Sequence, residues 1–166
     1  LCNLEQIESA GESAGRSGCH MFFSRDTRFV VKVISIHDKD VLLEQVFDDL
    51  FEYLQDTPSS LLCRIYGVYK IKQILKHNIY VVLLENLISR IPAHSLQAIY
   101  DLKGSTVNRW SSEKDKVKKD TNFLQNQKFL SVADCDRTNL LKTIETDVKF
   151  LKSLGLMDYS LLVTVV

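Results

Sequence analysis

One stretch of the sequence decides the fold, Phe29-Val30-Val31-Lys32-Val33-Ile34-Ser35-Ile36. It is rich in β-branched residues, which favour strands, and a shorter run, His20-Met21-Phe22-Phe23-Ser24, precedes it. Between the two runs lies a plausible turn, Arg25-Asp26-Thr27. The pattern therefore predicts a β-hairpin.

A helix is expected next, over about residues 40–55, because apolar side chains recur there at helical spacing. These side chains are Leu43, Val46, Phe47, Leu50 and Leu54. We expect Asp38 or Asp40 to cap this helix, and Thr57-Pro58 to end it, because the residue before a proline disfavours helical backbone.

The rest of the chain predicts more strands and a second long helix. The expected strands lie near residues 63–71, 78–84, 98–102 and 161–166. Residues 111–121 are polar and lysine-rich, which predicts an exposed loop, and residues 138–154 predict a helix that Gly155 ends. The order of elements predicts an α+β fold, in one domain over residues 1–166.

Charge is balanced overall but unevenly distributed. Lys plus Arg and Asp plus Glu number 21 each, so net charge alone names no partner. We expect no nucleic-acid partner. Residues 38–56 hold seven acids and one base, and residues 103–128 hold seven bases and three acids. Such blocks usually form solvated faces, although a basic face also suits an anionic membrane.

Location is constrained by the cysteines and the hydropathy. The four cysteines are scattered, without a CxxC pair, which fits a reducing cytoplasmic compartment. No apolar run approaches the roughly 20 residues that cross a bilayer, and no secretory signal is present. We therefore expect a cytoplasmic protein that contacts membranes only peripherally. The first residue is not Met and the last strand is apolar, so we also expect a fragment.

Lys32 is the first residue whose chemistry needs an explanation. It stands in a strand with apolar neighbours, where a lysine is costly unless an anion meets it or its head reaches water. Upstream lies Gly15-Arg16-Ser17-Gly18, whose backbone can turn several N–H groups toward an oxyanion. Protein-kinase-like folds hold ATP phosphates with such a loop and a strand lysine. Taken alone, an ordinary turn and an edge lysine are the commoner explanations.

Two further strings carry candidate groups. Asp101-Leu102-Lys103-Gly104-Ser105-Thr106 offers a lysine, flexible backbone and two hydroxyls, which suit a phosphate oxygen or simply form a polar turn. In Met157-Asp158-Tyr159-Ser160-Leu161-Leu162, Asp158 follows a helix and precedes an apolar strand. A carboxylate there either caps structure or accepts the proton of an attacking hydroxyl. Glu44 lies on the polar side of its helix, so we expect it to be solvated.

Together, these strings resemble the phosphatidylinositol phosphate kinases. DLKGST and MDYSLL stand in the family's order behind a glycine loop and a VVKVI strand, and Lys119-Asp120-Thr121-Asn122-Phe123 also matches. The resemblance runs from about Gly15 to the last residue. It implies a protein-kinase-like N-lobe with an antiparallel sheet and helices, then the start of a C-lobe, truncated.

The resemblance also implies an ATP site. The residues that match the phosphate-covering loop are Gly15, Ser17 and Gly18, and the ATP-phosphate lysine is Lys32. The residues at the family's adenine-binding hinge are Glu85, Asn86 and Leu87. The residues that match the element lining the nucleotide are Lys103, Gly104 and Ser105.

Catalysis is implied in the same way. Asp158 matches the family's catalytic-loop aspartate, so the expected catalytic residues are Asp158 and Lys32. The reaction implied transfers the γ-phosphoryl group of ATP, with Mg²⁺, to an inositol hydroxyl of a phosphatidylinositol phosphate. The expected conversion is from phosphatidylinositol 4-phosphate to the 4,5-bisphosphate. No metal ligand is assigned. The expected bilayer contact is a basic face with four lysines, Lys114, Lys116, Lys118 and Lys119. A homodimer is a further expectation from the family.

Family members continue beyond MDYSLL with a second aspartate for magnesium and a loop that selects the lipid. We therefore expect these 166 residues alone to show little or no kinase activity. The alternative is a non-catalytic nucleotide- or lipid-binding module that partners a full kinase.

Overall fold

The computed structural model describes residues 8–9, 20–72, 77–126 and 132–166. The predicted phosphate-covering residues Gly15, Ser17 and Gly18 lie outside the described residues, so their role stays a prediction. The chain divides into two compact units, Leu1–Ser89 and Arg90–Val166. The expected single kinase domain over residues 1–166 likewise stays a prediction.

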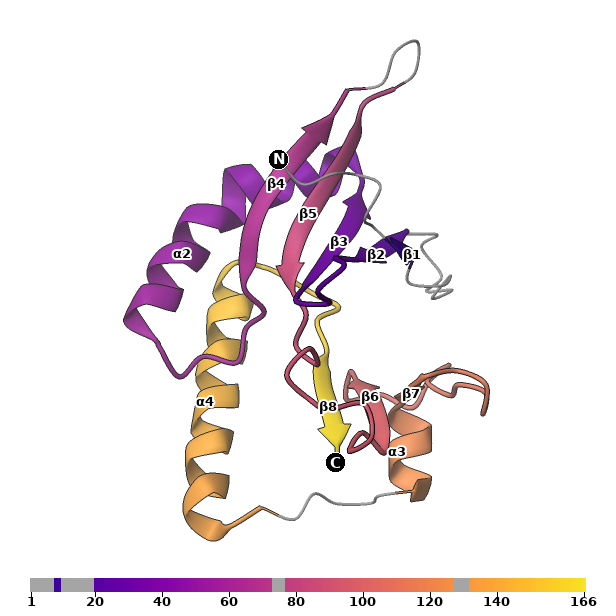
Figure 1. The fold of residues 1–166 in the computed structure, drawn as a ribbon. Coiled ribbons are helices and arrows are strands. Elements are labelled where there is room, and N and C mark those ends of the chain that lie inside the picture. Colours follow the sequence, from indigo (N-terminus) through magenta and orange to yellow (C-terminus); the bar gives the residue numbers. More distant parts are fainter. Residues whose placement is uncertain (1–7, 10–19, 73–76, 127–131) are drawn as a thin grey trace. The chain divides into compact units, whose positions relative to one another are not determined.

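The first unit contains a sheet of five strands in which every neighbouring pair is antiparallel. In chain order the strands are β1 (Glu8–Ser9), β2 (Met21–Phe23), β3 (Phe29–Ile34), β4 (Ile65–Ile71) and β5 (Ile79–Glu85). Their order in the sheet is β1-β2-β3-β5-β4 (Figure 1). The predicted hairpin is confirmed as β2 and β3, and the antiparallel sheet with helices confirms a mixed α and β architecture.

The helix between β3 and β4 begins earlier than predicted. It comprises α1 (Ile36–Val41), a π-helical turn η2 (Leu42–Val46) and α2 (Phe47–Asp56). Its N-cap is Ser35, whose Oγ accepts from the Asp38 N–H at 3.0 Å while Asp38 Oδ2 accepts from the Ser35 N–H at 3.2 Å. The predicted caps Asp38 and Asp40 were therefore wrong. This reciprocal capping box also ends β3 at Ile34, before the two last residues of the expected strand.

The π-helical turn η2 changes which side chains the helix buries. Val46 and Leu50 are buried as predicted, but Leu43 is 47% exposed. A π-helical turn holds more residues than an α-helical one, so residues in it lose the spacing that an α-helix would give them. Leu43 therefore does not share the buried face of Val46 and Leu50.

Among the described residues of this unit, the buried apolar side chains come from the helix and from β3 and β5. They are Val30, Val46, Leu50, Val81 and Val82. Because β5 buries two consecutive side chains, which point to opposite faces, both faces of the sheet are covered at its centre.

The second unit is built around β6 (Ala98–Leu102), which matches its predicted range. It pairs in parallel with β7 (Val117–Lys119) and antiparallel with β8 (Leu161–Val165). The helix α3 (Asp120–Asn126) follows β7 directly. The expected exposed loop over residues 111–121 is thus wrong in part, because it contains β7 and two buried residues, Ser111 and Asp120.

The helix α4 (Asp134–Ser153) is longer than predicted at its N-terminus, but its end is as expected. Gly155 has φ +67°, a left-handed conformation that glycine adopts without a steric penalty. Its N–H donates to the Lys152 carbonyl at 3.0 Å, and the Leu156 N–H donates to the Leu151 carbonyl at 3.1 Å. These bonds satisfy carbonyls that the helix end leaves free.

Candidate active site

Lys32 lies in the middle of β3, half-buried, directly opposite Met21 of β2 and Val82 of β5. Residues directly opposite in an antiparallel pair have side chains on the same face, so the Lys32 stem lies among apolar groups. The pKa of Asp38 is lowered, first by the hydrogen bond from Ser35 and also by the positive charge of Lys32. The ammonium group is therefore within electrostatic reach of the start of the helix.

The predicted hinge at the end of β5 is organised by Asn86, which is 8% exposed. Its Nδ2 donates to the Thr27 carbonyl at 2.6 Å and its backbone N–H to the Arg28 carbonyl at 2.9 Å. Its own carbonyl accepts from the Ser89 N–H at 3.0 Å. Asn86 thus fastens β5 to the turn between β2 and β3, and its backbone groups are already used.

Leu87 is the hinge residue that remains open to a ligand. The Glu85 N–H donates to the Arg64 carbonyl at 2.9 Å, so Glu85 is also engaged. Leu87 is 45% exposed, and its N–H and carbonyl make no hydrogen bond within the described part of the chain. Of the three predicted hinge residues, Leu87 is the one whose backbone can pair with a flat heterocycle.

The loop after β6 is closed by a carboxylate from the protein itself. The N–H groups of Lys103, Gly104 and Ser105 lie 3.0, 2.8 and 3.4 Å from Oδ1 of Asp120. Gly104 has φ +72°, and this left-handed conformation lets consecutive N–H groups converge on one anion. The backbone that the sequence suggested for a phosphate is therefore occupied, and the side chains of the loop are what a ligand can reach.

The second oxygen of Asp120 binds Arg109. Arg109 Nε lies 2.7 Å from Asp120 Oδ2, and Arg109 Nη2 contacts the Asp101 carbonyl and lies 3.0 Å from Asp101 Oδ2. Burial raises the pKa of Asp120, but the hydrogen bonds from Arg109 and the backbone outweigh it, so the net pKa is lowered. Asp120 is therefore an anion that joins both ends of the loop.

Asn122 holds a later part of the same loop, at Ser111, and the last residue of β7, Lys119. Its Oδ1 accepts from the Ser111 N–H at 2.9 Å and from the Lys119 N–H at 3.3 Å, and its Nδ2 donates to the Ser111 carbonyl at 3.0 Å. The ring of Phe123 meets that of Tyr100 edge-on, with centroids 5.2 Å apart.

Sequence reasoning missed the roles of Arg109, Asp120 and Asn122 in building the site. The only signal was the string Lys119-Asp120-Thr121-Asn122-Phe123, which counted as part of the family resemblance. Nothing in its spacing predicts which loop these side chains hold.

Lys103 and Asp158 are brought together, although 55 residues separate them. Lys103 Nζ forms an ion pair with Asp158 Oδ1, and the exposed fractions of the two side chains are 26% and 82%. The hydrogen bond from Lys103 is the main reason that the pKa of Asp158 is lowered. Asp158 has φ 64°, a conformation that few residues other than glycine adopt and that often marks functional sites.

Two of the predicted site residues thus share one place in the second unit, a lysine and an exposed carboxylate. Lys32, Asn86 and Leu87 belong to the first unit. A carboxylate kept ionised by a neighbouring lysine can accept a proton, and the lysine can bind an anionic group beside it.

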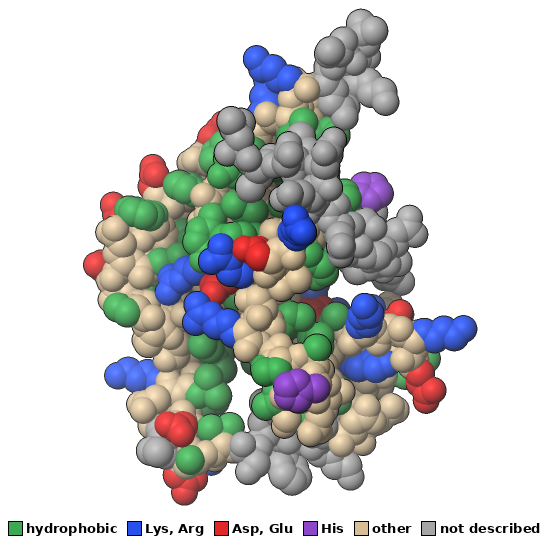
Figure 2. All heavy atoms as spheres, viewed as in Figure 1, with side chains coloured by type: hydrophobic (Ala, Val, Ile, Leu, Met, Phe, Trp, Pro, Cys, Tyr) green, Lys and Arg blue, Asp and Glu red, His purple; other side chains and the backbone are tan. Residues whose placement is uncertain are grey.

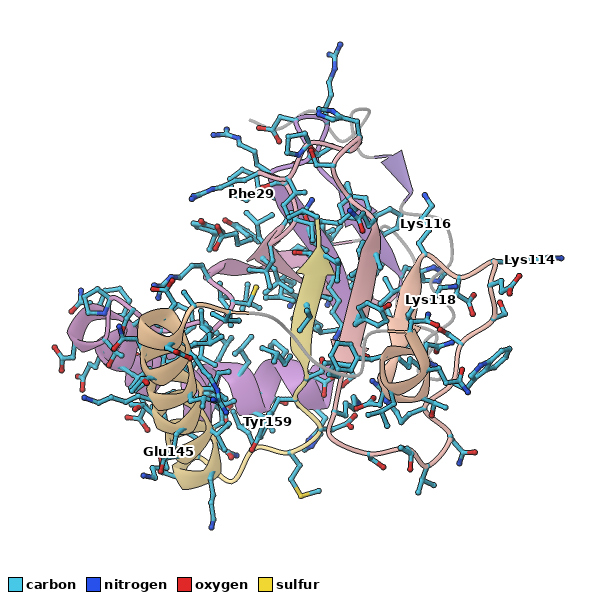
Figure 3. All side chains as sticks on the ribbon, turned by 90° about the horizontal axis from the view of Figure 1, so that it is seen from below. Phe29, Lys114, Lys116, Lys118, Glu145 and Tyr159 are labelled. Atoms are coloured by element: carbon cyan, nitrogen blue, oxygen red, sulfur yellow. The ribbon has the colours of Figure 1, made fainter. Side chains whose placement is uncertain are left out.

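The basic stretch is less uniform than its sequence suggested. Lys118 Nζ donates to the Ser112 carbonyl at 2.8 Å and to the Glu113 carbonyl at 3.1 Å, so it closes a turn. Lys119 is half-buried, whereas Lys114 and Lys116 are exposed, and Lys114 extends away from the ribbon in Figure 3. Two of the four lysines are therefore free to meet a partner surface.

Comparison with known proteins gives a consistent match. The family model for phosphatidylinositol-4-phosphate 5-kinase matches residues 1–166. The chain is 34% identical over 163 residues to phosphatidylinositol 4-phosphate 5-kinase its3 of Schizosaccharomyces pombe, covering 95% of this chain and 22% of the relative. It is 34% identical over 171 residues to human phosphatidylinositol 4-phosphate 5-kinase type-1 alpha, covering 99% of this chain and 29% of that protein.

The chain therefore spans about a quarter of the length of these curated relatives. The match extends over every element described above, including the loop held by Asp120 and the segment that carries Asp158. The chain belongs to the phosphatidylinositol-4-phosphate 5-kinase family.

Proposed function

We propose that the protein carrying this chain is a lipid kinase. It transfers the γ-phosphoryl group of ATP to an inositol hydroxyl of a phosphatidylinositol phosphate, converting the 4-phosphate to the 4,5-bisphosphate. The observation that carries the proposal is the ion pair between Lys103 and Asp158, which places a proton acceptor beside a cation. The names of the relatives, phosphatidylinositol 4-phosphate 5-kinases, support the choice of substrate.

Asp158 acts as the general base that receives the proton of the attacking hydroxyl. Its exposure lets a substrate approach, and like any aspartate without a raised pKa it is ionised at neutral pH and can accept a proton. Lys103 positions this carboxylate and binds the negative charge of the transferring group. Phosphoryl transfer depends mainly on such positioning and charge stabilisation.

The first unit supplies the nucleotide site. The order β3, helix, β4, β5 in an antiparallel sheet supports a protein-kinase-like N-lobe. Lys32 binds the ATP phosphates, Leu87 binds adenine through its backbone, and the loop with Gly15, Ser17 and Gly18 covers the phosphates. The family resemblance also assigns Lys103, Gly104 and Ser105 of the second unit to the nucleotide, and that assignment stays a prediction.

ATP is the proposed cosubstrate and Mg²⁺ the proposed metal. Within the described residues, no group of three or more His, Cys, Asp or Glu side chains lies together as a metal site. No ligand of the proposed Mg²⁺ is therefore assigned among the described residues.

The proposed location is the cytoplasm, with peripheral contact at the cytosolic face of a membrane. No helix in the described residues has the length and apolarity to cross a bilayer. The exposed Lys114 and Lys116 support the proposed contact, because lysines suit an anionic bilayer. A homodimer stays a prediction from the family.

Replacing Lys32 with Met, in the whole protein that carries this chain, tests the nucleotide site. We expect kcat/KM for ATP to fall on the order of 100-fold, because a cation on the phosphates is lost while the apolar stem is kept. Steady-state assays on phosphatidylinositol 4-phosphate vesicles measure this. The matched control is Lys70→Met, an exposed lysine of β4 in the same sheet, which should change little. An active Lys32→Met enzyme would refute the proposed role.

Replacing Lys103 with Met tests the ion pair through its pH dependence. Because Lys103 lowers the pKa of Asp158, its removal raises that pKa. The acidic limb of the pH–rate profile of kcat should therefore move to higher pH, in addition to any loss of rate. Lys142→Met, an exposed lysine of α4, is the control. If the acidic limb does not move, Asp158 is not the group whose pKa determines it.

A further inference from the structure

Trp110 is the only tryptophan of the chain, and it is 56% exposed. Both of its neighbours are held inward. Arg109 is bound by Asp101 and Asp120, and Ser111 is buried against Asn122. The Trp110 side chain is therefore presented to the outside by a fixed backbone.

A second apolar side chain lies in the turn before it. The Arg109 N–H donates to the Thr106 carbonyl at 3.4 Å, and Asn108 has φ 56°, so residues 106–109 form a tight turn. Val107 lies in this turn and is 76% exposed. Exposing both Val107 and Trp110 costs hydrophobic free energy that an apolar partner would recover.

A run of exposed charges lies next in the chain, in which Glu113 and Asp115 alternate with Lys114 and Lys116. Lys114 and Lys116 are exposed, and Lys and Arg side chains project from the surface over β7 and the loop before it (Figure 2). Asp115, between these lysines, is also exposed, but its Oδ2 is held by the Ser112 N–H at 2.8 Å and by the Ser112 Oγ at 2.9 Å. These hydrogen bonds are the main reason that the pKa of Asp115 is lowered.

We propose that Val107, Trp110, Lys114 and Lys116 form a membrane-docking surface, on which Trp110 enters the interfacial layer of an anionic bilayer. Tryptophan suits that layer because its ring is largely apolar while its N–H can meet water or headgroups. Each lysine near an anionic surface adds favourable electrostatic free energy. The inference rests on the proposed function, since a lipid substrate must be reached in its bilayer.

The size of this surface favours a bilayer over a protein. A stable protein interface takes about 20–30 residues from each partner, whereas this docking surface is four side chains in one loop. A bilayer needs no matching shape, so a presented tryptophan with adjacent lysines is enough for reversible, peripheral binding.

Fluorescence tests insertion directly. The emission of the purified protein is compared with that of a Trp110→Phe variant, and the difference spectrum belongs to Trp110. We expect this difference to shift to the blue on adding phosphatidylcholine vesicles that contain phosphatidylserine. Lipids brominated near the headgroup should quench it. An unshifted, unquenched spectrum at vesicle concentrations that bind the protein would overturn the proposal.

Vesicle sedimentation measures how much each side chain of the docking surface contributes to the affinity for vesicles. Trp110→Ala should weaken binding about tenfold, the effect of losing one large apolar contact. The matched control is Leu141→Ala on α4, a side chain that is 54% exposed and outside the docking surface, which should bind as the wild type does. Lys114→Ala and Lys116→Ala should each cost about fivefold on phosphatidylserine vesicles and little on pure phosphatidylcholine.

A soluble substrate separates this inference from the proposed kinase activity. Trp110→Ala should phosphorylate monomeric, short-chain phosphatidylinositol 4-phosphate at the wild-type rate. If the wild type phosphorylates no phosphoinositide but still needs Trp110 to bind vesicles, the proposed function fails and the docking surface stands. Two results would overturn the docking surface. One is equal vesicle binding by Trp110→Ala and wild type. The other is a blue shift of Trp110 emission on adding a soluble cell protein fraction but not on adding vesicles, which would indicate a protein partner.

Discussion

Asp158→Asn is expected to lower kcat for lipid phosphorylation by about 10²–10⁴-fold, the contribution of a positioned general base. Asparagine has nearly the same shape as aspartate but does not accept a proton at neutral pH. KM for ATP should change little, because Asp158 contacts the attacking hydroxyl in the proposed mechanism and not the nucleotide. Initial rates on vesicles containing phosphatidylinositol 4-phosphate measure both constants.

Asparagine is also the right replacement for the backbone. Asp158 has φ 64°, and Asn tolerates the left-handed region better than most residues, so the turn before β8 should be kept. The neighbour Tyr159 is 41% exposed, and Tyr159→Phe serves as a control that removes a polar group without touching the ion pair. Wild-type kcat in Asp158→Asn would exclude Asp158 as the base.

Asp120→Ala is expected to destabilise the protein by about 3–5 kcal/mol, the cost of removing one partner of a buried ion pair. Arg109, whose side chain is 13% exposed, would keep only Asp101 as a partner. The three N–H groups of residues 103–105 would lose their acceptor as well. Denaturant unfolding measures the loss, and Asp115→Ala, an exposed acid nearby, should cost far less.

The pH dependence gives a second measurement of the same contact. The pKa of Asp120 is lowered in the folded state, so its charge stabilises the fold fully above the ordinary aspartate pKa of about 3.9. That stabilisation is lost as the pH falls through the lowered pKa. The difference in unfolding free energy between wild type and Asp120→Asn should therefore narrow in acid. A difference that does not change with pH would contradict the assignment.

Elements with a strong local pattern were predictable from the sequence. The strand β6 has its predicted range, and β3 and β5 lie within one or two residues of theirs, because β-branched and aromatic residues fill them. The glycine stop of α4 follows from the conformational freedom of Gly155 alone. Such features depend on neighbouring residues and need no knowledge of the tertiary structure.

The start of the long helix and the loop after β6 were not predictable in the same way. Ser35 was counted with a strand because its neighbours are apolar, although its hydroxyl binds the Asp38 N–H. The bonds of Asp120 join groups 11–17 residues apart, which no periodicity records. A polar, lysine-rich sequence predicts exposure, and only the partners of Asp120 and Asn122 explain why those residues are buried.

The pairing of Lys103 with Asp158 was also beyond the local pattern. The sequence placed each residue just outside a strand, and the family resemblance assigned each a role. Their meeting depends on the antiparallel register of β6 with β8, in which Leu102 lies opposite Leu161. That register brings the residue after one strand close to the turn before the other.

The polar interior around the loop after β6 has a thermal consequence. Among the described residues of Arg90–Val166, the buried apolar side chains are Ile99 and Tyr100. The buried polar ones are Ser111, Asp120, Asn122 and Asp147. Exposing apolar surface raises the heat capacity and exposing polar surface lowers it. Unfolding this unit therefore raises the heat capacity less than unfolding a unit of equal size with a purely apolar core would. The free energy of unfolding of this unit therefore changes little with temperature. The loop and the turn that hold Asp158 should keep nearly the same stability over the temperatures at which a cell works.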